Sequence, residues 1–239
     1  MNINGPKVIF VLPFFDGIPI TETVLVSWLI MGLVFVIIKI LTWNMSKRKI
    51  GTKQALAEKL VITMNNLVGS SMGEGNEVFV PYITALFIFS LLSSLAGLFA
   101  LRPPTADFNM TLTWALMTFF MIQYNGIKYK GIKQYLKSFF QPVAFMFPMN
   151  LISEVAIPVS LSFRHFGNIA AGVIITQLIY TGLTAASALI PVIGKYIPIL
   201  QVGVPAILSV YFDLFSAFMQ AFILISSTMA YVSSAKEQE

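Results

Sequence analysis

The fold is decided by the stretch Thr23–Trp43, which reads TVLVSWLIMGLVFVIIKILTW and holds one charged residue, Lys39. A helix needs about 20 mostly apolar residues to cross the hydrocarbon core of a bilayer. This stretch is long enough, and it is followed by the basic cluster Lys47–Lys49. An aromatic residue and basic residues at one end are typical of a membrane–water interface. The stretch therefore predicts a membrane-crossing helix.

The composition of the whole chain agrees with this interpretation. Of 239 residues, 57% are hydrophobic and 10% are charged, and the mean hydropathy is +0.82. A soluble globular protein has about 25% charged residues, so the chain is an integral membrane protein. The net charge of +5 is typical of basic cytoplasmic loops, so we expect no nucleic-acid partner. With no cysteine and one histidine, we expect no disulfide and no Cys/His metal site. We also expect no bound cofactor.

The apolar stretches predict an all-α polytopic protein with about five membrane-crossing helices. They comprise residues 23–43, 80–101, 110–124, 159–189 and 204–235. Residues 44–78 are more polar and predict an amphipathic helix on the membrane surface, and residues 1–20 predict an external tail near the bilayer rather than a cleaved signal peptide.

The last two helices are longer than a straight crossing requires. They would span about 46 and 48 Å at about 1.5 Å per residue, whereas the hydrocarbon core is about 30 Å thick. Helices of that length must tilt, kink or lie partly along the membrane. We expect a tilted hairpin that lays a curved face against a partner.

Basic residues predict the orientation of the chain. The segment after the first span and the loop Lys128–Lys137 are rich in lysine, whereas the opposite loops each hold one basic residue, Arg102 and Lys195. Lysine-rich loops are cytoplasmic by the positive-inside bias. Five crossings then place the N-terminus outside and the C-terminus inside.

Three charged residues, Glu154, Arg164 and Asp213, lie within apolar stretches. Such charges are costly and usually face a protein interior or a water-filled cavity, which makes them functional candidates. Arg164 lies far from either polar loop and does not lose its proton in a protein. Small or polar residues share its helix face and would let another helix approach closely: Ser160, Gly167, Asn168 and Ala171. The alternative is a structural ion pair of Arg164 with Asp213 or Glu154 inside the bundle.

The last helix carries polar residues along one face from end to end. They are Ser209, Asp213, Ser216, Gln220, Ser227, Tyr231 and Ser234. This stripe indicates either an aqueous path or a hydrogen-bonded helix contact, since serines in membrane helices often bond their own backbone. His165 could relay protons near neutral pH, but a single histidine is more often a packing residue.

The stretch 148–172, PMNLISEVAIPVSLSFRHFGNIAAG, resembles subunit a of bacterial F-type ATP synthases. Three shorter stretches agree with the same family: GLF at 97–99, PPTADFNMT at 103–111 and QAFI at 220–223. Their order and spacing match from about residue 21 to residue 234. The resemblance implies a single membrane domain over residues 1–239.

The resemblance also implies a function. Subunit a is the stator that faces the rotating c-ring and works with subunit b and the rest of the complex in the bacterial plasma membrane. It provides two half-channels for H⁺ or Na⁺, couples ion flow to ATP synthesis and has no catalytic site of its own. An alternative is a small permease with Arg164 as an anion-binding residue, and a third is a purely structural assembly subunit. No internal repeat is evident, unlike in many secondary transporters.

The family's functional residues map onto this chain by position. Arg164 matches the essential arginine, and Asn168 and Gln220 match polar residues near it. Asp213 lies where other members have histidine or an acid, while His165 follows the arginine where leucine is common. We therefore expect ion translocation to involve Arg164, Asn168, Asp213, Gln220, Glu154, Ser216 and His165.

Overall fold

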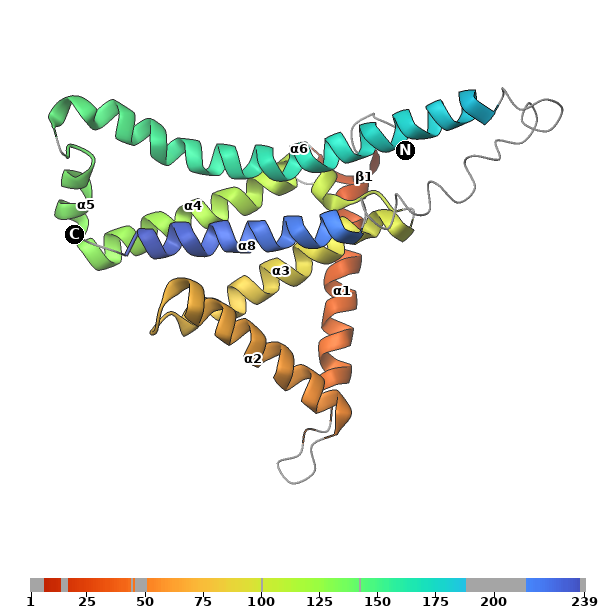
Figure 1. Cartoon of the computed structure of the whole chain (residues 1–239), viewed down its shortest axis with the longest axis horizontal. Coiled ribbons are helices and arrows are strands. Elements are labelled where there is room, and N and C mark those ends of the chain that lie inside the picture. Colours follow the sequence, from red (N-terminus) through yellow and green to blue (C-terminus); the bar gives the residue numbers. More distant parts are fainter. Residues whose placement is uncertain are drawn as a thin grey trace.

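A computed structural model describes residues 7–13, 17–43, 45, 51–99, 101–141, 143–187 and 214–236. The chain is mostly helical, as predicted (Figure 1). The helices are α1 (Glu22–Thr42), α2 (Thr52–Met72), α3 (Val80–Leu95), α4 (Phe108–Lys130), α5 (Ile132–Ser138), α6 (Phe147–Ser187) and α8 (Ser216–Ser234). Short 3-10 turns are η1 (Glu77–Phe79), η2 (Ala96–Phe99), η3 (Pro104–Ala106) and η4 (Ala144–Met146).

The predicted N-terminal tail contains a small β-hairpin. Strands β1 (Val8–Leu12) and β2 (Ile18–Thr21) pair antiparallel, with Gly17 at a positive φ of 89° in the turn. Glu22 N donates to Lys7 O at 2.9 Å and ties the hairpin to the start of α1. Branched apolar residues favour extended backbone, and glycine permits the left-handed turn conformation.

Four helical segments in the described part of the chain are long and apolar enough to cross a membrane. They are Glu22–Thr42, Glu77–Phe99, Ala144–Ser187 and Ser216–Ser234. Helix α4 covers the predicted span 110–124 but is not among the four. The predicted helix 204–235 is observed from Leu214 onward, and its earlier part lies outside the described residues.

Helix α6 is one continuous helix of 41 residues with Pro158 inside it, so the predicted start at residue 159 was wrong. Proline removes a backbone hydrogen bond, but membrane helices tolerate it where neighbouring groups satisfy the freed backbone. At about 1.5 Å per residue the helix is about 60 Å long, roughly twice the bilayer core. It therefore cannot cross straight, and Figure 1 shows it running along the whole body.

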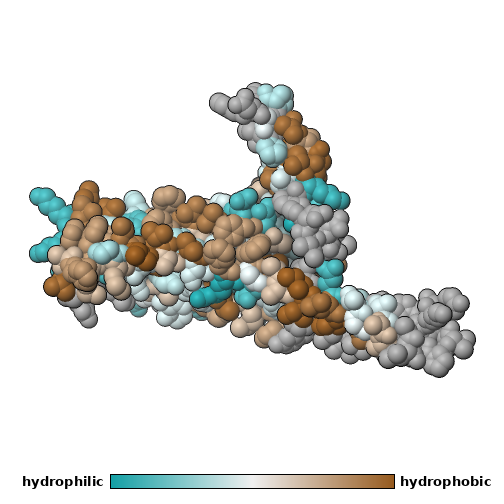
Figure 2. Space-filling model, turned by 90° about the horizontal axis from the view of Figure 1, so that it is seen from above, coloured by the Kyte–Doolittle hydropathy of each residue, from teal (hydrophilic) through white to brown (hydrophobic). Residues whose placement is uncertain are grey.

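The core lies between α2, α3, α4 and α8, where buried apolar side chains form one cluster that includes Val68, Ile83, Trp114, Ile225 and Met229. Helix α6 packs mainly on α4, and α8 packs mainly on α3. Apolar residues also cover much of the outer surface, as Figure 2 shows, while hydrophilic residues gather at the end of the body that carries α5. An apolar exterior suits a chain whose solvent is lipid.

The predicted surface helix corresponds to α2. Its residues Met64, Val68 and Met72 are buried and are spaced four apart on one face. That face packs against the protein helices α1, α3 and α8. Leu56 and Ile62 remain exposed, so α2 presents apolar side chains both to its neighbouring helices and to the outer surface.

The predicted basic loop is helical rather than irregular. Lys128 and Lys130 occupy the last turn of α4, where positive charges interact favourably with the helix dipole. Gly131, at φ 75°, turns the chain into α5, which carries Lys133 and Lys137.

The end of α8 is held by a basic side chain. Lys236 Nζ lies 4.7 Å from the ring of Phe79 and 4.6 Å from the ring of Tyr129, and it donates to Asn76 Oδ1. These cation–π contacts and the amide hold the C-terminal end of α8 against the start of α3 and the end of α4.

Candidate ion-translocation site

Arg164 lies on an exposed face of α6. Its side chain and those of Ser160, Asn168 and Ala171 are exposed, as is Gly167. Arg164 forms no ion pair with any residue that the structure describes. The predicted face of small and polar residues therefore points away from this chain's own core and includes a charge that the described part does not neutralise.

The glycines beside Arg164 are not required by packing against the described residues. A Cβ placed at Gly167 or at Gly172 would meet nothing within 4 Å. Gly126 in α4 is the opposite case, since a Cβ there would lie 2.7 Å from the ring of Tyr135. The small residues near Arg164 thus leave an open surface.

Glu154 is held elsewhere, at the α5 end of the molecule. Gln123 Nε2 donates to Glu154 Oε2 at 2.9 Å, and the Tyr135 hydroxyl donates to Gln123 Oε1. Burial raises the pKa of Tyr135 to about 12, and the negative charge of Glu154 adds to the rise, while the hydrogen bond to Gln123 opposes it. The structure therefore does not show the ion pair between Arg164 and Glu154 that the sequence left open.

Gln123 and Tyr135 were missed by sequence reasoning. Gln123 comes from α4, Tyr135 from α5 and Glu154 from α6. No spacing in the sequence links the three, because residues of different helices share no periodicity.

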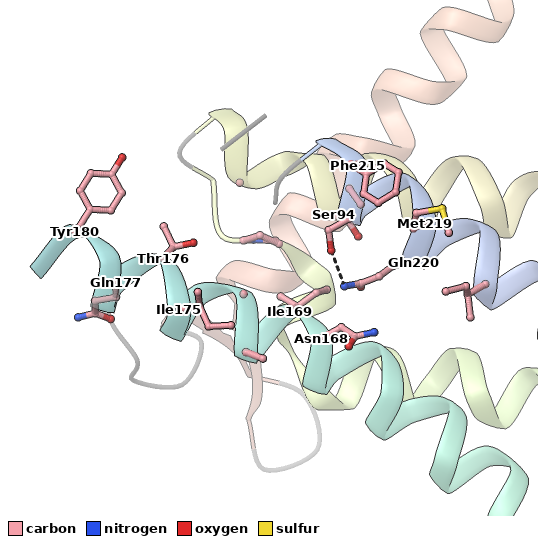
Figure 3. Close-up of a pocket in the computed structure, with 17 residues that line it drawn as sticks. Ser94, Asn168, Ile169, Ile175, Thr176, Gln177, Tyr180, Phe215, Met219 and Gln220 are labelled. Atoms are coloured by element: carbon pink, nitrogen blue, oxygen red, sulfur yellow. Dashed lines mark hydrogen bonds between the residues drawn. The ribbon is translucent and has the colours of Figure 1, made fainter. Parts of the chain in front are cut away.

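A pocket of about 810 Å³ lies between α6 and α8, beyond Arg164 along the chain. Polar residues of its lining come from three helices (Figure 3): Asn168, Thr176 and Gln177 from α6, Ser216 and Gln220 from α8, and Ser94 from α3. Gln220 Nε2 donates to Ser216 Oγ at 3.4 Å. Sequence reasoning found Asn168, Ser216 and Gln220 but missed Ser94, which lies in the otherwise mostly apolar helix α3 beside Ser93.

The polar stripe of the last helix is only partly observed. Gln220 is buried, Ser216, Ser227 and Tyr231 are half-buried, and Ser234 is exposed. Ser209 and Asp213 lie outside the described residues. The alternative that pairs Arg164 with Asp213 is untested for the same reason.

His165 packs inside the bundle. It is 5% exposed, and its ring meets that of Trp114 edge-on with centroids 5.4 Å apart. A second, small cavity brings His165 together with Arg164, Asn168 and Gln220. Four of the predicted site residues therefore gather at one point between α6 and α8, while Glu154 is placed apart from them.

The fold and this arrangement define a polytopic helical membrane protein that brings charged and amide side chains of two long helices together within apolar surroundings. The family model described as ATP synthase A chain matches residues 24–233. The sodium-ion-specific ATP synthase subunit a of Propionigenium modestum is 30% identical to this chain. The match covers 98% of this chain and 86% of the relative. The chain belongs to the ATP synthase subunit a family.

Other relatives agree. ATP synthase subunit a of Legionella pneumophila is 35% identical over 74% of this chain and 76% of the relative. ATP synthase subunit a of Bacillus subtilis is 31% identical over 92% of this chain and 93% of the relative. The chain is therefore a multi-pass membrane component of the ATP synthase and serves as its stator subunit in ion translocation, and the permease alternative is not favoured.

Proposed function

We propose that Arg164 is the charge that this stator presents to the c-ring. The observation that carries the proposal is the exposed position of Arg164 on an open face of α6, with no ion pair among the described residues. A charge facing lipid would be costly. A ring of helices with buried carboxylates would cover this face and supply the opposite charge.

The physics of a permanent charge suits this role. Arg164 favours the ionised form of a ring carboxylate close to it, so the carboxylate releases its ion before it pairs with the guanidinium. The same charge repels cations and blocks a direct leak between the two sides. Rotation of the ring then becomes the path by which ions pass.

Two half-channels would reach the ring on opposite sides of Arg164 along α6. The first is the pocket between α6 and α8, with Asn168, Ser216 and Gln220 in its lining and Asp213 as a further polar group. The second includes Glu154, which comes ten positions before Arg164 and lies toward the lysine-rich α5. By the positive-inside bias, the α5 side is cytoplasmic, so the N-terminus is outside and the C-terminus inside.

The remaining parts of the proposal are those that the family resemblance implies. The translocated ion is H⁺ or Na⁺, and the partners are the c-ring, subunit b and the lipid bilayer. The chain forms one membrane domain, binds no cofactor and has no catalytic site of its own. ATP-driven pumping measured with and without sodium distinguishes the two ions.

The decisive experiment replaces Arg164 in the assembled complex. Arg164→Ala should leave a complex that assembles, fails to pump ions when ATP is added, and leaks passively because the barrier between the half-channels is lost. Lys130→Ala removes a positive charge outside this face and is the matched control. Normal ATP-driven pumping by Arg164→Ala would refute the proposal.

A further inference from the structure

A small cavity lies beside Arg164, next to the larger pocket. Its volume is about 10 Å³, and it shares Asn168, Gln220 and Ile223 with the lining of the large pocket. Its other lining residues are Leu161, Arg164, His165 and Leu224. The cavity therefore adjoins the large pocket, next to the helix turn that carries Arg164.

Two buried polar atoms belong to residues of this lining and have no hydrogen-bond partner within the described part of the chain. They are Nε2 of His165 and Oε1 of Gln220. His165 is 5% exposed and Gln220 is 6% exposed, so bulk water does not reach either side chain freely. Buried polar groups without partners are rare in folded proteins, and each calls for an explanation.

We propose that His165 and Gln220 together bind one water molecule in this cavity. A volume of about 10 Å³ is close to the smallest that holds a water, and a buried water needs two to four polar partners. The amide oxygen of Gln220 accepts a hydrogen bond from the water, and Nε2 of the neutral imidazole donates or accepts according to its tautomer. Asn168 and Arg164, which share the lining, supply further polar groups.

The water gives His165 a role that packing against Trp114 alone would not. The amide of Gln220 is then held at both ends, since Nε2 donates to Ser216 and Oε1 accepts from the water. His165 is a positioning residue in this scheme, because it acts on Gln220 through the water. The water also extends the polar lining of the large pocket to the turn of α6 that carries the guanidinium of Arg164.

The consequence for transport rests on the proposed function, whereas the water site itself does not. The first test is therefore a structure of the complete ATP synthase in lipid, at a resolution that shows ordered water. We expect a density peak within hydrogen-bond distance of both His165 Nε2 and Gln220 Oε1. The peak should be lost in His165→Leu and retained in His165→Gln, which keeps a polar side chain.

Three results would overturn the water site: a direct hydrogen bond between His165 and Gln220, a side chain of the 188–213 segment in the cavity, or an unchanged peak in His165→Leu. For the positioning role, ATP-driven pumping by His165→Leu should fall by about fivefold, as expected for one lost hydrogen bond, and His165→Gln should recover most of it. If His165→Leu pumps normally while Arg164→Ala does not, the positioning role fails and the proposed function stands.

Discussion

The carboxylate of Glu154 is bound by the amide of Gln123, with 2.9 Å between Oε2 and Nε2, and not by Arg164. Both charges lie on α6, yet Glu154 has its partner on α4 while Arg164 has none among the described residues. Ten positions along a helix correspond to about 15 Å, too far for contact. The same helix therefore places a bound carboxylate and an exposed guanidinium at separate levels.

The bond between Gln123 and Glu154 can be tested by removing its donor. Gln123→Leu should lower the free energy of unfolding by about 1–3 kcal/mol, because it leaves a half-buried carboxylate without that hydrogen bond. Thermal unfolding of the purified complex, monitored through the loss of this subunit, measures the effect. Gln177→Leu changes a glutamine in the large pocket and is the control, and equal stability of the two variants would contradict the prediction.

The raised pKa of Tyr135 predicts an alkaline limit to stability. Its folded-state pKa of about 12 lies above the ordinary value of 10.0, so the folded state favours the protonated phenol. The resulting stability is present below about pH 10 and is lost as the pH rises toward about 12. The free energy of unfolding of the wild type should therefore fall more over this range than that of Tyr135→Phe, which cannot ionise.

Tyr124→Phe is the control for that titration, because Tyr124 is 65% exposed. Ultraviolet difference spectra of the wild type against Tyr135→Phe should show the tyrosinate of Tyr135 forming as the pH approaches about 12. Ionisation of the Tyr135 phenol near the ordinary value of 10.0 would contradict the assigned environment.

The two glycines Gly126 and Gly167 should respond in opposite ways to a methyl group. Gly126→Ala places a Cβ 2.7 Å from the Tyr135 ring, and overpacking of this kind costs about 1–3 kcal/mol. Gly167→Ala meets nothing within 4 Å and should gain about 0.5–1 kcal/mol within the chain, since alanine favours a helix more than glycine does. Thermal unfolding of the purified subunit in detergent compares them, and equal effects would show that the Tyr135 ring moves away freely.

A larger side chain at Gly167 tests whether its face meets a partner. Gly167→Leu should leave the purified subunit as stable as the wild type but should weaken assembly with the c-ring or ATP-driven pumping, because the bulky side chain holds the two surfaces apart. Gly32→Leu is a matched control on α1, where a Cβ also meets nothing within 4 Å. If Gly167→Leu assembles and pumps as well as Gly32→Leu, the open face does not dock against the ring.

The orientation of the chain can be checked by labelling, because the sequence contains no cysteine. Cysteines introduced at Lys130 and Lys195 should react with an impermeant thiol reagent from opposite sides of the membrane, with position 130 on the cytoplasmic side. Labelling of both positions from the same side would contradict the five-crossing topology.

Much of the fold followed from local features of the sequence. Runs of about 20 apolar residues predict membrane helices wherever they occur, so α1 and α3 lie close to the predicted spans. Arg164 and the small residues on its helix face could be predicted as a site from the sequence, because a charged residue within an apolar membrane helix is costly and usually functional. The family resemblance also rests on contiguous residues, those of 148–172.

The tertiary structure alone decided which side chains meet. Gln123 and Tyr135 join Glu154, and His165 lies with Gln220 at one small cavity, because helices distant in the sequence pack side by side. The structure also decided that α6 continues through Pro158 and that residues near Val8 pair with those near Thr21. Helix periodicity reports which residues share one face of a helix, but it carries no information about which other helix covers that face.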